Sequence, residues 1–188
     1  AFEASCNEMG LASHPDKAKI AVHNEEEAVL AKEFFPDAKV VFSCKFGGLP
    51  FGADDGVRRM LEERRLRSKI SLDLLPEMQS KQCGLLLLRY CAVSSPVHLA
   101  RLSPSDVVLE HLRKCDEDIM DTLSRLVMGG DDLPADVAEW MRLPLRHTGL
   151  GVTSTAEIRD LAFCASLVDR LKAIRRLGGS SAVLSRAR

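Results

Sequence analysis

Apolar residues recur along most of the chain at the spacing of an α-helix. In residues 106–128 they step by three or four positions, which places them on one face of a helix. The same reasoning predicts further helices over residues 25–35, 57–75, 135–141 and 155–177, with Trp140 as a core anchor of the third and Ser154 or Thr155 at the start of the last. Residues 17–23 alternate between apolar and polar, and residues 38–46 are rich in Val and Phe, so two short strands are expected near the N-terminus. The pattern therefore predicts a mostly α-helical α+β protein.

The most apolar stretch is residues 82–104, near the middle of the chain. The run Leu85–Leu88 would cover most of a helix circumference, which predicts a central helix buried on several sides. Pro96 should divide this helix into two pieces that meet at a kink. Because the apolar run before Arg89 is far shorter than the roughly 20 residues that cross a bilayer, no membrane span is expected.

Composition places the chain among globular proteins. It has 188 residues, 46% of them hydrophobic, which is enough to form a core. The six cysteines are spread singly without a C-x-x-C pair, so they are expected to be reduced core thiols. Together with the lack of a visible leader, this predicts an intracellular protein of the nucleus or cytoplasm.

The net charge of −1 conceals two basic segments. Acids outnumber bases in residues 1–37 and 103–139, whereas bases dominate one predicted helix and the C-terminal tail. The helix carries Arg58, Arg59, Arg64, Arg65, Arg67 and Lys69, and the tail carries Arg170, Lys172, Arg175, Arg176, Arg186 and Arg188. Such segments could hold a polyanion, because local potential attracts phosphates. The alternative is that each is an ordinary solvated helix face.

Glycines gather in a short segment after the second predicted strand. Gly47, Gly48 and Gly52, with Pro50, predict a tight turn that another backbone or a ligand could approach closely. Asp54 and Asp55 follow at once, and paired aspartates can bind two metal ions. Here they directly precede a helix, so we interpret them as N-terminal capping residues and expect no metal site.

No self-contained catalytic site is evident in the sequence. The chain has neither a G-x-S-x-G elbow nor a Walker loop. Cys91 and His98 are roughly 10.5 Å apart along a helix, with Pro96 between them, so a nucleophile–base pair is not expected. An independent enzyme is therefore the least favoured interpretation.

Four landmarks in order are more specific than composition. They are GL followed by HPDK at residues 10–17, FGGLPFG at 46–52, LLLLRYCA with HLARLSP between 85 and 104, and LPLRHTGLGVTS at 143–154. In this order the chain resembles the C-terminal part of reverse transcriptases encoded by non-LTR retrotransposons, over roughly residues 2–167. The family usually has Asn where His14 stands and Gly where Thr148 stands.

The resemblance implies a role for each landmark. Lys17 would lie near the incoming triphosphate, at the end of the palm subdomain. Residues 1–53 would be the end of the palm, with Gly47, Gly48 and Gly52 in the primer-grip turn. Residues 54–130 would be similar to the helical thumb, and residues 131–188 would be the post-thumb segment and tail. The expected phosphate contacts are Arg58, Arg59, Arg65 and Lys69. The aspartates that hold Mg²⁺ in the complete polymerase are not in this chain, which is expected to hold no cofactor and to be inactive alone.

The resulting hypothesis is the C-terminal portion of an RNA-directed DNA polymerase that binds an RNA/DNA duplex and the remainder of the polymerase. The alternative is a domesticated, non-catalytic helical structural or adaptor subunit of a larger assembly. The acidic face of residues 106–128 and the changes at His14 and Thr148 favour that alternative. Salt-dependent binding of duplex would separate the two.

Overall fold

The computed structural model describes residues 19–22, 24–131 and 133–176. The described chain is mostly helical with a few short strands, which confirms the predicted fold class. It divides into two compact units, Ala1–Met60 and Leu61–Arg188, and the division falls within helix α3 (Asp54–Leu74). The predicted Lys17 and the motif residues 10–16 lie outside the described residues.

The first unit begins with a small parallel β-α-β arrangement. Strand β1 (Lys19–Ala21) pairs in parallel with β2 (Lys39–Val41), and helix α2 (Glu25–Phe34) connects them. Asn24 caps α2 because its side-chain oxygen accepts a hydrogen bond from the Glu27 amide at 2.8 Å. The acidic residues of the first helical turn complement the positive end of the helix dipole.

A β-hairpin follows in the same unit. Strands β3 (Ser43–Phe46) and β4 (Leu49–Gly52) are antiparallel, with Phe46 opposite Leu49. The prediction of one strand over residues 38–46 is therefore wrong. Residues 38–46 form two strands that are separated at Phe42, because β2 pairs with β1 whereas β3 pairs with β4. The Phe42 carbonyl accepts a hydrogen bond from the Ala53 amide at 2.8 Å.

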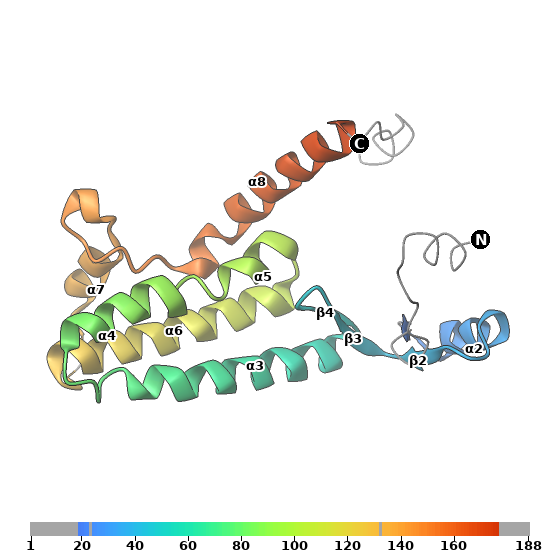
Figure 1. Ribbon diagram of the computed structural model, residues 1–188, viewed down its shortest axis with the longest axis horizontal. Coiled ribbons are helices and arrows are strands. Elements are labelled where there is room, and N and C mark those ends of the chain that lie inside the picture. The colour runs from blue at the N-terminus through green and yellow to red at the C-terminus, as the bar shows by residue number, and fades with distance from the viewer. Residues whose placement is uncertain (1–18, 23, 132, 177–188) are drawn as a thin grey trace, which may run out of the picture. The chain divides into compact units, whose positions relative to one another are not determined.

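The second unit is a helical bundle (Figure 1). After α3 its helices are α4 (Lys81–Leu87), a π-helical turn (Leu88–Ala92), α5 (Val97–Leu102), α6 (Asp106–Met128), α7 (Ala135–Arg142), a 3₁₀ turn (Leu145–His147) and α8 (Thr155–Arg176). The predicted break near Pro96 is present, but it is preceded by a widened turn in which the Val93 amide donates to Leu88 O at 3.0 Å.

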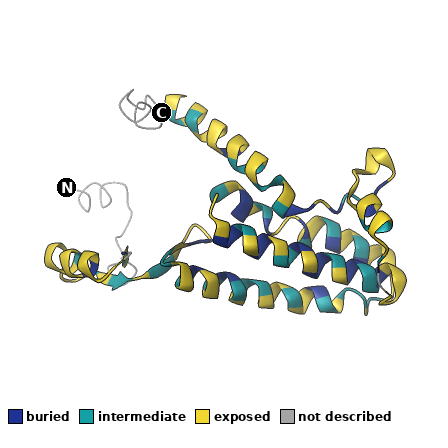
Figure 2. Cartoon of the chain, turned by 180° about the vertical axis from the view of Figure 1, so that it is seen from behind, coloured by how far each residue is buried: buried dark blue, intermediate teal, exposed yellow. Residues whose placement is uncertain are grey.

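Helix α6 is the centre of the bundle. Its apolar residues Ile119 and Leu123 join Leu72, Leu88, Val93, Met141 and Val152 in one core cluster. Figure 2 shows the buried residues along the facing sides of the helices. The predicted burial of Leu85–Leu88 on several sides is wrong, because Leu88 is buried while Leu86 and Leu87 are exposed. Packing against α6 covers one side of this stretch only.

Two smaller expectations also differ from the structure. No cysteine among the described residues is buried, and Cys83, Cys91 and Cys164 are exposed thiols rather than core residues. Trp140, expected to anchor the core, is exposed on α7, where Met141 occupies the buried position instead.

The segment Lys81–Leu102 is 22 residues long and has the length and composition of a membrane-spanning helix, with 33% of its apolar window buried. Core helices of proteins that do not enter membranes meet the same criterion. The predicted absence of a membrane span therefore stays a prediction.

Candidate nucleic-acid interface

The glycine segment forms the turn of the β3–β4 hairpin. Gly47 and Gly48 have φ angles of 57° and 81°, which matches a two-residue turn that requires left-handed backbone at both positions. Both residues are exposed, and a methyl group placed on Gly47 would have no atom of the described chain within 4 Å. At Gly47, therefore, no described atom would meet an added Cβ.

Gly52 has a different, internal role. Its φ is 117°, and a Cβ atom there would lie 2.0 Å from the Phe42 carbonyl oxygen. Only glycine fits this crossing of β4 with the residue before β3, so the fold itself accounts for Gly52. No ligand is needed to explain it.

Aromatic side chains flank the turn. The rings of Phe46 and Phe51 meet edge to face with centroids 6.4 Å apart, and Phe46 is 77% exposed. Large exposed apolar side chains beside a glycine turn are unusual for a solvated hairpin and are typical of a contact surface.

The predicted phosphate contacts Arg58 and Arg59 lie at the start of α3, in the first unit, and both are exposed. Asp54 and Asp55 occupy the first turn of the same helix, as expected for capping acids. Among the described residues, no group of three or more His, Cys, Asp or Glu side chains is arranged to hold a metal ion.

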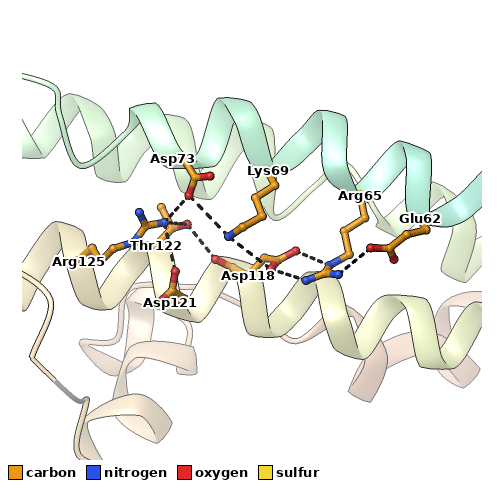
Figure 3. Close-up of polar contacts among 8 residues, drawn as sticks. All are labelled: Glu62, Arg65, Lys69, Asp73, Asp118, Asp121, Thr122 and Arg125. Atoms are coloured by element: carbon orange, nitrogen blue, oxygen red, sulfur yellow. Dashed lines mark hydrogen bonds and ion pairs between the residues drawn. The ribbon is translucent and has the colours of Figure 1, made fainter.

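The other two predicted contacts, Arg65 and Lys69, face the protein itself. The Arg65 guanidinium binds both carboxylate oxygens of Asp118 on α6, at 2.6 and 2.9 Å, and also binds Glu62 at 3.0 Å (Figure 3). Lys69 Nζ lies 3.8 Å from Asp118 and 3.6 Å from Asp73. These contacts form an ion-pair ladder that joins α3 to α6.

Arg125 extends the ladder from the α6 side. Its Nη2 atom lies 2.7 Å from Asp73 and 3.2 Å from Asp121. The Arg125 hydrogen bond lowers the pKa of Asp73, and the hydrogen bond to Asp118 raises the pKa of Arg65. The ladder residues, Glu62, Arg65, Lys69, Asp73, Asp118, Asp121 and Arg125, thus neutralise one another within the second unit.

The C-terminal basic segment has a different environment. Arg170, Lys172, Arg175 and Arg176 are all exposed on the second half of α8, and none of the four makes an ion pair with another described residue. Arg170 Nη2 donates to the Arg101 carbonyl at 3.3 Å, which brings the exposed Arg101 of α5 beside this group. We call these five residues the α8 basic patch.

The segment before α8 holds that helix in place. Buried Asp116 of α6 accepts from the Ser154 hydroxyl at 2.6 Å and from the Thr155 and Ala156 amides, each at 3.0 Å. Its carboxylate therefore satisfies the first amides of α8 and complements the helix dipole. The sequence predicted a cap by Ser154 or Thr155, but it contained no signal for the distant Asp116.

Thr148 introduces backbone strain into the same segment. Its φ of 64° is left-handed and makes it the one non-glycine residue with positive φ in the described chain. A β-branched residue rarely adopts this conformation, which glycine adopts freely.

In comparisons with known proteins, no family model, no curated protein and no solved structure matches the chain.

Proposed function

We propose that the chain is the palm-end and thumb portion of a retroelement reverse transcriptase. In this proposal it binds primer–template duplex, while the aspartates that hold Mg²⁺ belong to the remainder of the polymerase. A thumb grips duplex through its phosphates without reading sequence, so it needs cations on rigid helices. The observation that carries the proposal is the α8 basic patch, whose exposed cations have no carboxylate partner among the described residues.

Two backbone features support the same proposal. The left-handed conformation of Thr148 is the one expected where the family usually has glycine, because glycine has no Cβ to clash there. The turn at Gly47 and Gly48 is exposed and has left-handed backbone at both positions, which suits a tight glycine turn such as a primer grip.

The ladder changes which cations are assigned to the grip. Arg65 and Lys69 are bound to Asp118 and Asp73, so their charges are already compensated. Within the proposal, Arg58 and Arg59 remain candidates on the first unit, and the α8 basic patch serves on the second. Lys17 keeps its proposed position near the triphosphate.

Filter binding of a labelled RNA–DNA duplex across a salt series tests the proposal. If about four phosphates are neutralised, log K should fall against log salt with a slope of about −3.6. A slope near zero, or no retention at low salt, would contradict duplex binding.

The second candidate is a helical structural or adaptor subunit. It is favoured by the large apolar side chains exposed in the first unit, among them Val29, Leu30, Phe34, Phe35 and Phe46. Such a surface suits a protein partner. A folded chain that fails to retain duplex at any salt concentration would support this candidate over the first.

A further inference from the structure

A cavity of about 260 Å³ lies within the helical unit, between α3, α6 and the π-helical turn. Its lining is mostly apolar, with Leu72, Leu75, Leu87 and Ile119 among the contributing side chains. A dry cavity of about 150 Å³ is sufficient to bind benzene. The space here is therefore large enough for a bicyclic molecule.

Small side chains keep this cavity open. Ser68 and Ser71 of α3 face it from one wall, and Ala92 and Ser95 face it from the other. Protein interiors are otherwise close-packed, with few voids larger than a water molecule. A single leucine in place of one of these residues would occupy much of the space.

The cavity is accessible from solvent. Its lining includes the exposed residues Ser68, Ser71 and Cys91, so its mouth lies on their side. On this side the Arg64 guanidinium donates to the Ser95 carbonyl at 3.2 Å, which joins α3 to the segment after the π-helical turn. A ligand could therefore enter without unfolding of the bundle.

The inner wall is electrically neutral. His111 is only 5% exposed, and burial lowers its pKa to about 4, so the ring is uncharged at neutral pH. Its Nε2 atom lies 3.5 Å from the sulfur of half-buried Cys115, and loss of contact with water raises the pKa of that thiol to about 12. The charges of Arg65 and Asp118 at this wall compensate each other through their two hydrogen bonds.

We propose that this cavity binds a neutral, mostly apolar small molecule of bicyclic aromatic size that carries one hydrogen-bonding group. Serine hydroxyls and the neutral His111 ring supply polar partners, and leucine and isoleucine side chains supply the apolar contact. The two arginines at this cavity are already hydrogen-bonded, Arg64 to the Ser95 carbonyl and Arg65 to Asp118, so an anionic ligand would lose its hydration for partners that are already engaged. This site is independent of duplex binding and does not rest on the proposed polymerase role.

Indole is a suitable probe, because it is bicyclic, neutral and has one N–H donor. Titration of the isotope-labelled chain should give saturable methyl shifts at Leu72, Leu87 and Ile119. Ser68→Leu should weaken indole binding at least tenfold by filling the cavity. Glu63→Leu, an exposed α3 position outside the lining, is the matched control and should leave binding within twofold of the original chain.

Ser71→Leu fills the same cavity from the next turn of α3 and replaces Ser68→Leu if that variant does not fold. The proposal is overturned if the methyls at the cavity do not shift up to the solubility limit of indole. It is equally overturned if the shifts persist unchanged in a folded cavity-filled variant, because indole would then bind elsewhere.

Discussion

Replacement of Asp118 by Asn tests whether the ladder is a structural element of the bundle. Asp118 is 9% exposed at its side chain, and its carboxylate receives two hydrogen bonds from Arg65 and a longer contact from Lys69. Asparagine keeps the size of the side chain but removes the charge. The substitution leaves Arg65, whose side chain is 22% exposed, facing a neutral amide.

The expected cost follows from these contacts. Removal of one partner of a buried ion pair costs about 3–5 kcal/mol. Arg65 retains Glu62 at 3.0 Å and some contact with water, which reduces the penalty. We therefore expect the free energy of unfolding to fall by about 2–3 kcal/mol, and the melting temperature by roughly 5–10 °C.

Urea denaturation followed by far-ultraviolet circular dichroism measures this cost. The matched control is Asp121→Asn, because Asp121 also pairs with a ladder arginine but is 58% exposed, and it should cost no more than about 0.5 kcal/mol. A double-mutant cycle with Arg65→Gln should give a coupling energy of about 2 kcal/mol. A cost for Asp118→Asn equal to the control, or additive single variants, would refute the structural role of the pair.

Three further predictions concern backbone strain and a buried histidine. Thr148→Gly should stabilise the chain by about 1 kcal/mol in urea denaturation, because glycine adopts the left-handed conformation without steric cost; destabilisation would show that the residue is not strained. Gly52→Ala should cost more than about 3 kcal/mol, whereas Gly129→Ala, also left-handed but with no neighbour within 4 Å, should cost about 1 kcal/mol; equal costs would exclude the clash with Phe42. Because the pKa of His111 is lowered to about 4, below its unfolded value, its contribution to stability is complete at neutral pH and is lost as the pH falls from about 6.5 to 4. From pH 7 to pH 5 the loss should be about 2 kcal/mol, and a folded His111→Gln variant should lack this part of the pH dependence of stability.

The sequence was most informative where its pattern was local. The step of three or four residues along α6 predicted the helix Asp106–Met128, and the burial of Leu112, Ile119 and Leu123 follows the predicted face. The cap at Ser154 belongs to the same class, since it depends on neighbouring residues. Local chemistry of this kind is visible in the order of residues alone.

The ladder could not be predicted in this way. Arg65 and Asp118 are 53 positions apart, and no local signal states which face of α3 turns toward α6. The sequence showed the acids of α6 only as one acidic helix face, yet Asp116 and Asp118 are buried and bind α8 and α3. A charged residue on a helix becomes a structural contact only when the bundle places an opposite charge against it, which depends on tertiary packing.

Duplex binding by matched charge variants tests the central claim most directly. Salt-dependent binding of an RNA–DNA duplex should be compared among the original chain, an α8 variant with Arg170, Lys172, Arg175 and Arg176 replaced by Gln, and a ladder variant, Arg65→Gln with Lys69→Gln. All three must retain the helical circular dichroism signal. We predict that the α8 variant loses most of its affinity for duplex and that the slope of log K against log salt falls toward zero. The ladder variant should keep its affinity within about threefold, because Arg65 and Lys69 are already paired with carboxylates in the original chain. Loss of binding in the folded ladder variant, with binding retained in the α8 variant, would contradict the account.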